Sequence, residues 1–164
     1  ERGCPPGLSA AVQYAVFPGG ARVRPRLCLA VAAACGERGP GIADGAASAI
    51  ELLHCASLVH DDLPCFDDAP LRRGKPSVHC AYGERLAVLA GDALIVTAFE
   101  ALGRASAAHP DRLVKLLATI AASVSMPTGI VAGQAWECET QVVLDDYQRA
   151  KTGSLFAAAA VAGA

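Results

Sequence analysis

With 164 residues, the chain is long enough for one domain with a substantial hydrophobic core. Hydrophobic residues make up 53% of it and aromatic residues only 5%, so the core must consist mainly of Ala, Leu and Val, which favours closely packed helices. The net charge of −2 argues against a nucleic-acid-binding protein, which would need a basic face. Seven cysteines without a CxxC pair predict small, buried, reduced thiols in a cytoplasmic protein. Neither a signal peptide nor an uninterrupted apolar run of about 18 residues is seen, so no transmembrane segment is expected.

The expected secondary structure is almost entirely helical. Small or apolar residues at Ile50, Leu53, Ser57 and Leu58 recur at helical spacing, and clusters of Gly and Pro separate the helical stretches. A loop is predicted over 63–77, and no strand is expected. The predicted helices cover 8–16, 22–35, 43–62, 84–104, 110–125, 128–138, and a last stretch that begins near 144 and continues past 151, with Gly153 as a weak point.

The end of the third predicted helix is strongly acidic. Asp61, Asp62, Asp67 and Asp68 lie within eight positions, and each member of the second pair follows its counterpart by six residues. A loop of that length can fold back, so that two carboxylates converge on one cation. Mg²⁺ prefers one or two carboxylates together with substrate phosphate oxygens and water. The acidic segment therefore predicts a magnesium site that a phosphorylated ligand completes.

Basic residues follow the acidic segment at once. Arg72, Arg73 and Lys75 lie in the predicted loop, and the planar guanidinium of arginine matches two phosphate oxygens at a time. His54 precedes Asp61 by seven residues, or two helical turns, so both side chains face the same way. Together these residues predict a pocket for Mg²⁺ and a diphosphate.

Several motifs resemble those of the trans-prenyltransferases, the polyprenyl synthetase family of isoprenyl diphosphate synthases. DDLPCFDD and LRRGKPS (61–77) resemble its first aspartate-rich motif, and PGGARVRP (18–25) resembles its GGKRLRP. ELLHCASLVHDD (51–62), LAGDAL (89–94), GQAWE (133–137) and KTGSLF (151–156) match in the same order. The chain is most similar to the geranylgeranyl diphosphate synthases of phototrophic, carotenoid-making bacteria. The resemblance implies an all-α isoprenoid synthase helical bundle, usually a homodimer.

The resemblance also implies roles for individual residues. It assigns two or three Mg²⁺ ions to Asp61 and Asp67 when diphosphate is bound. It places the allylic diphosphate at Arg72, Lys151 and Thr152, and Gln134 matches the GQ pair. Isopentenyl diphosphate is assigned to Gly20, Arg24, His54 and Arg73. The implied catalytic residues are Asp61, Asp62, Asp67, Arg72 and Lys151. The chain departs from the family at Ala21, where the family has a lysine, and Arg22 is the nearest replacement cation.

The implied reaction is the head-to-tail condensation of isopentenyl diphosphate with an allylic diphosphate. Ala56 is the fifth residue before Asp61, where farnesyl-making relatives often carry an aromatic residue that closes the product channel. Alanine leaves the channel open and predicts a C20 product, geranylgeranyl diphosphate, for carotenoid- or chlorophyll-type isoprenoids. Ser57 and Phe99 are further predicted determinants of product length.

The domain, residues 1–164, is expected to be incomplete at its C-terminal side. Residues 153–164 are apolar, and no second aspartate-rich motif follows Asp146, so a polypeptide of only these residues is expected to be inactive. Three alternatives stay open: a farnesyl diphosphate synthase, a non-catalytic prenyl synthase subunit, and a metal-dependent phosphohydrolase using His54, His60 and Asp61.

Overall fold

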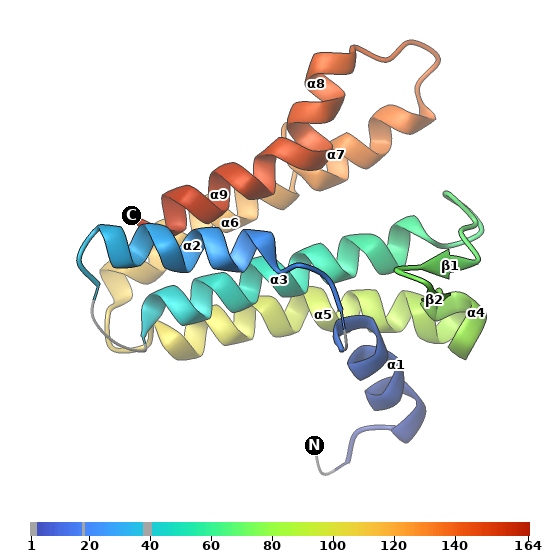
Figure 1. Ribbon diagram of the computed structural model, residues 1–164, viewed down its shortest axis with the longest axis horizontal. Coiled ribbons are helices and arrows are strands. Elements are labelled where there is room, and N and C mark those ends of the chain that lie inside the picture. Colours follow the sequence, from blue (N-terminus) through green and yellow to red (C-terminus); the bar gives the residue numbers. More distant parts are fainter. Residues whose placement is uncertain (1–2, 18, 38–40) are drawn as a thin grey trace. The chain divides into compact units, whose positions relative to one another are not determined.

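The computed structural model describes residues 3–17, 19–37 and 41–164, and this part of the chain is predominantly helical (Figure 1). The all-α expectation is therefore confirmed. The chain falls into two compact units, Glu1–Ala21 with Leu52–Thr97 and Arg22–Glu51 with Ala98–Ala164. We call these the first and the second unit. Helices α3 (Ile42–Asp61) and α5 (Glu84–Ala105) contribute residues to both.

The first unit contains α1 (Pro6–Val16), the end of α3, a hairpin of β1 (Leu71–Arg72) and β2 (Lys75–Pro76), α4 (Val78–Tyr82) and the start of α5. A Cβ at Gly91 of α5 would overlap the ring of His60, so glycine lets these two helices approach closely. Small residues also dominate the hydrophobic core, as the composition predicts. Its buried members are Ala11, Cys55, Ala56, Val59, Leu63, Val78, Ala87, Ala90 and Leu94.

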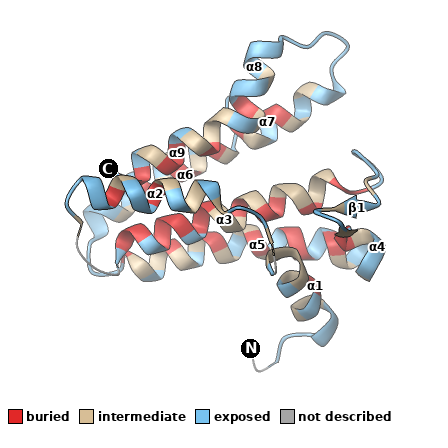
Figure 2. Cartoon of the chain, viewed as in Figure 1, coloured by how far each residue is buried: buried red, intermediate tan, exposed pale blue. Residues whose placement is uncertain are grey.

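The second unit contains the remaining elements. They are α2 (Val23–Ala34), α6 (Pro110–Val124), α7 (Ile130–Ala135) with a 3₁₀ turn (Trp136–Cys138), α8 (Leu144–Gln148), a π-helical turn (Arg149–Gly153) and α9 (Ser154–Gly163). Helix α9 packs along α2 and α6 (Figure 1). Its buried side chains are Leu155, Ala158, Ala159 and Ala162, and Figure 2 shows the buried face of this apolar helix.

The predicted helices all exist, but the loop after α3 is more ordered than expected. It contains a two-residue hairpin turn, because Arg73 (φ 54°) and Gly74 (φ 77°) both adopt the left-handed conformation of a type I′ turn. The short helix α4 follows directly. Near the C-terminal end, the predicted weak point at Gly153 is the last residue of the π-helical turn. Sequence periodicity misses both features because each spans five residues or fewer.

The expectation of buried cysteines is wrong for most of them. Cys28 and Cys55 are buried, whereas the other five thiols are exposed: Cys4, Cys35, Cys65, Cys80 and Cys138. Apolar surroundings in the sequence do not show which side of a helix or loop a thiol faces, and that side decides its burial.

Two helices, α3 and α5, are long and apolar enough to cross a membrane by length and composition alone. The most apolar window of α3 is 67% buried and that of α5 is 33% buried. Helices that form the core of soluble proteins meet the same two criteria.

Candidate active site

The loop after α3 folds back on the end of this helix, as the six-residue spacing predicts. The backbone N–H of Asp67 donates to the carbonyl of Asp61 over 3.0 Å, and that of Ala69 donates to Asp62 over 3.2 Å. One carboxylate oxygen of Asp61 and one of Asp67 consequently lie within 4.8 Å of each other. Asp61 is mostly buried, whereas Asp67 is exposed. This pair of oxygen donors fits Mg²⁺, which takes few protein ligands and keeps positions for water and phosphate.

The second aspartate of the motif points elsewhere. Asp62 is only 2% exposed, and its carboxylate accepts hydrogen bonds from Arg72 Nε over 2.9 and 3.1 Å and from Arg72 Nη2. These hydrogen bonds raise the pKa of the Arg72 guanidinium above its usual value. Arg72 Nη2 also lies 3.5 Å from Asp61 Oδ2. Asp62 therefore fixes Arg72 beside the Asp61 carboxylate.

The hairpin separates the two neighbouring arginines. Arg72 lies in β1, paired with Lys75 of β2, whereas Arg73 occupies the turn. A Cβ at Gly20 would lie 2.6 Å from Arg73 Cζ, so the guanidinium rests against glycine backbone. The structure thus brings Arg73 and Gly20 together, two residues predicted to serve the same diphosphate. Gly20 also has a φ of 76°, which disfavours a side chain there.

The histidines near this site have different surroundings. His54 is half-buried in α3, and its carbonyl accepts a hydrogen bond from Ser57 Oγ over 2.8 Å. His60 Nε2 lies 3.3 Å from the Val88 carbonyl and 3.7 Å from Asp92 Oδ1, so this ring packs against α5. In a phosphohydrolase the His60 ring would have to leave these contacts with α5 and turn toward a metal.

A second cluster, within the second unit, surrounds Glu137. Its carboxylate accepts hydrogen bonds from Gln134 Nε2 over 2.8 Å, from Tyr147 Oη over 2.6 Å and from Lys151 Nζ. The bond to Glu137 raises the pKa of the Tyr147 hydroxyl. A Cβ at Gly133 would overlap the Lys151 backbone, so α7 packs directly on the π-helical turn. The predicted residues Gln134 and Lys151 are thus joined through one carboxylate.

Tyr147 is a member of this cluster that the motifs do not reveal. It precedes Lys151 by four residues, and this i,i+4 spacing on a helix is the one signal that could have identified it. The neighbouring Thr152 is exposed.

The two arginines of the PGGARVRP motif both contact side chains within the second unit. Arg22 forms an ion pair with Glu51, which compensates its charge. The guanidinium of Arg24 lies 4.4 Å from the ring centroid of Phe156 in a cation–π contact.

The three predicted determinants of product length are all on long helices. Ala56 is 1% exposed and belongs to the core of the first unit. Ser57 and Phe99 are half-buried.

The fold is helical, two carboxylates converge at the end of one helix, and a hairpin that carries arginines adjoins them. This arrangement has the donors that proteins of the Mg²⁺- and diphosphate-binding class use. The family follows from comparison with known proteins: residues 5–164 match the model of the polyprenyl synthetase family, and the chain belongs to this family. It is 59% identical, over 98% of its length, to "Geranylgeranyl diphosphate synthase" of Cereibacter sphaeroides. It is 56% identical, over 98% of its length, to the protein of the same name from Rhodobacter capsulatus.

Solved structures agree on the fold. An FPP/GFPP synthase from Zymomonas mobilis is 39% identical over 96% of this chain, with a TM-score of 0.87 and 59% of its own length covered. A geranyltransferase from Legionella pneumophila is 33% identical over 98% of this chain, with a TM-score of 0.86 and 60% of its own length covered. The chain spans 56% of the Cereibacter and 55% of the Rhodobacter relative.

Proposed function

We propose that the protein is a prenyltransferase that joins isopentenyl diphosphate head-to-tail to an allylic diphosphate and makes geranylgeranyl diphosphate. The observation that carries this proposal is the folded-back acidic loop, which sets the carboxylates of Asp61 and Asp67 within 4.8 Å of each other beside Arg72. Its relatives in phototrophic bacteria that are named geranylgeranyl diphosphate synthase support the C20 product.

The residues of the chain have separate tasks in this reaction. Bound Mg²⁺ supplies positive charge that stabilises the departing diphosphate. Asp61 and Asp67 hold the metal, with Asp62 orienting Arg72 toward the allylic diphosphate. Lys151, with Gln134 and Thr152, serves the same diphosphate. Stabilisation of the leaving group and positioning of the reactants account for most of such catalysis.

The second substrate attacks through its double bond. We propose that Arg73 holds isopentenyl diphosphate against the backbone of Gly20, with Arg24 and His54 as further ligands. A proton is then lost to diphosphate oxygen, so no protein base is required. The hydrocarbon chain would extend along α3 past Ala56 and Ser57, with Phe99 as a deeper limit.

We further propose a soluble, cytoplasmic homodimer that supplies carotenoid- or chlorophyll-type pathways. Exposed apolar side chains on α5, Val88, Leu89 and Val96, support self-association. Light scattering of the purified protein tests this, and a monomer at micromolar concentration would contradict it.

The reaction is tested on the intact polypeptide with radiolabelled isopentenyl diphosphate, each allylic primer in turn, and Mg²⁺. We expect a C20 product with release of pyrophosphate. Asp67→Asn should lower kcat by about 100-fold or more, whereas Asp111→Asn, a matched change at an exposed position in the first turn of α6, should not.

The other outcomes identify the alternatives. A C15 product would favour a farnesyl diphosphate synthase. Inorganic phosphate in place of pyrophosphate would favour a phosphohydrolase. Binding of both substrates without turnover would favour a non-catalytic subunit, for which the replacement of the family lysine by Ala21 is the one specific observation.

A further inference from the structure

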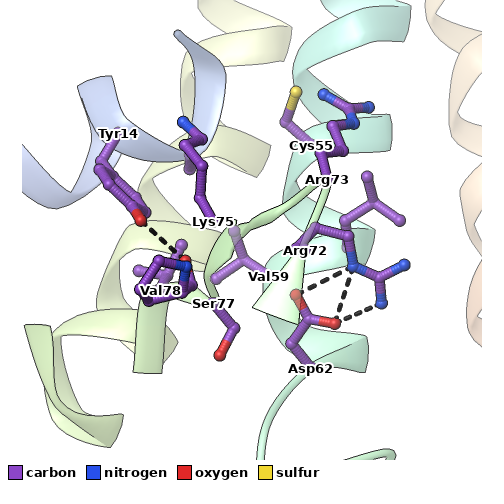
Figure 3. A pocket seen from close by; sticks show the side chains of 12 residues that line it. Tyr14, Cys55, Val59, Asp62, Arg72, Arg73, Lys75, Ser77 and Val78 are labelled. Carbon is purple, nitrogen blue, oxygen red and sulfur yellow. Dashed lines mark hydrogen bonds and ion pairs between the residues drawn. The ribbon is translucent and has the colours of Figure 1, made fainter. Parts of the chain in front are cut away.

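We propose that Lys75 is an additional binding residue for the diphosphate of the non-allylic substrate and that Tyr14 is its positioning residue. This inference deepens the proposed function and rests on it. The observation behind it is a pocket in the first unit that the acidic motif and the hairpin line together (Figure 3).

The pocket carries excess positive charge. Arg72, Arg73 and Lys75 all line it, together with Asp62. Asp62 compensates the charge of Arg72, to which it is hydrogen-bonded. Among the residues that the structure describes, no carboxylate forms an ion pair with Arg73 or Lys75. Two positive charges therefore remain at one pocket, and an anion of charge −2 or more would complement them.

Figure 3 shows that Arg72 turns toward Asp62, whereas the side chains of Lys75 and Arg73 both turn away from this carboxylate. Arg73 offers a planar fork of donors and Lys75 a compact ammonium with three donors. Because both residues line the pocket, together they offer donors of both kinds to one anionic ligand.

Lys75 is held in place before any ligand arrives. Its Nζ lies 4.4 Å from the ring centroid of Tyr14, and Tyr14 Oη donates to the carbonyl of Pro76 over 2.8 Å. The Tyr14 ring is itself fixed edge-on by Tyr82, with ring centroids 5.3 Å apart. Holding a flexible lysine in this way reduces the entropy lost on binding. A cation–π contact is weaker than charge-assisted hydrogen bonds to phosphate, so a ligand can still engage the ammonium.

The remaining walls of the pocket suit a short hydrocarbon attached to the anion. Leu58 and Val59 of α3 and Val78 of α4 also line it. The ligand class is therefore an organic diphosphate with a small apolar tail, as isopentenyl diphosphate is. Lys75 would also supply the positive charge that the family resemblance places at position 21, where this chain has alanine.

The direct test is calorimetric titration of the intact polypeptide with inorganic pyrophosphate in EDTA, which removes binding through metal at the acidic motif. We expect Lys75→Met to raise the Kd by about 10- to 100-fold. Lys75→Arg should stay close to wild type because it keeps the charge. Lys115→Met, a matched change at an exposed position in α6, should have no effect. An unchanged Kd in Lys75→Met, or an equal loss in Lys115→Met, would overturn the proposal.

A kinetic measurement separates this inference from the proposed function. Lys75→Met should raise the KM for isopentenyl diphosphate with little change in the KM for the allylic primer, and Tyr14→Phe should give a smaller change of the same kind. If the wild-type protein forms no prenyl product while Lys75→Met still weakens pyrophosphate binding, the proposed reaction is wrong and the pocket assignment stands. If the wild type is active and Lys75→Met changes neither constant, the pocket assignment is wrong. Lys75→Gln replaces Lys75→Met if the latter does not fold.

Discussion

Replacing Arg72 by alanine tests whether neighbouring arginines of one motif have different physical roles. Arg72 is bonded to Asp62, whose side chain is 2% exposed, whereas Arg73 is exposed at the hairpin turn. Removing Arg72 would leave a buried carboxylate without its cation. Removing Arg73 would leave no buried charge unpaired.

The expected loss follows from this burial. Removing one partner of a buried ion pair costs about 3–5 kcal/mol. The Arg72 side chain is 35% exposed, so water screens part of the interaction, and we expect Arg72→Ala to lower the free energy of unfolding by about 2–4 kcal/mol. In a chain of this size the melting temperature should fall by roughly 4–16 °C. Arg73→Ala should cost less than about 1 kcal/mol.

Urea unfolding of the intact polypeptide, followed by far-UV circular dichroism, measures these free energies. The double variant Asp62→Leu with Arg72→Met should be more stable than either single change, because neither group is then left unpaired. If Arg72→Ala were as stable as Arg73→Ala, the reasoning that Asp62 depends on Arg72 would be refuted.

Three further predictions concern Ala56 in the first unit and Cys28 in the second. Ala56→Phe should shorten the main product from C20 to C15, because an aromatic ring at this position would close the product channel that we propose along α3. Chromatography of the dephosphorylated products measures this, and an unchanged product pattern would show that Ala56 does not set chain length. Burial, with smaller contributions from Glu37 and Asp44, raises the pKa of the Cys28 thiol from 9.0 to about 11. Iodoacetamide at mildly alkaline pH should therefore modify the exposed Cys65 much faster than Cys28, as peptide mass spectrometry would show. Because the pKa of Cys28 is higher in the folded than in the unfolded state, its contribution to stability is fully present below about pH 9 and is lost as the pH rises toward 11. The difference in free energy of unfolding between the wild type and Cys28→Ala should change accordingly between these pH values. An unchanged difference would contradict the prediction.

The acidic loop shows how far local sequence rules reach. The six-residue spacing of Asp61 and Asp67 predicts a loop that folds back, and the backbone hydrogen bond between these residues realises it. The helix ends were also predictable, because Gly and Pro affect the backbone only within a few residues of their own position. The small hairpin and α4 were missed because segments of two to five residues carry no periodicity.

The partners of individual side chains were less predictable. Sequence alone presents Arg72 and Arg73 as equivalent members of one motif. The structure distinguishes them through the hairpin register and the carboxylate of Asp62, ten residues away in the chain. Likewise, Arg22 was the nearest replacement for the missing lysine by position, but its ion pair with Glu51 depends on the packing of α2 within the second unit.

The sequence by itself determined the all-helical class, the family and the chemistry of the acidic and basic motifs, because composition, helical periodicity and motif spacing are properties of neighbouring residues. Only the tertiary structure decided which arginine is held by a buried carboxylate, which thiols are exposed, and that the Lys75 ammonium lies over the Tyr14 ring. These features depend on how different elements pack together and on burial and distance, which exist only once the chain has folded.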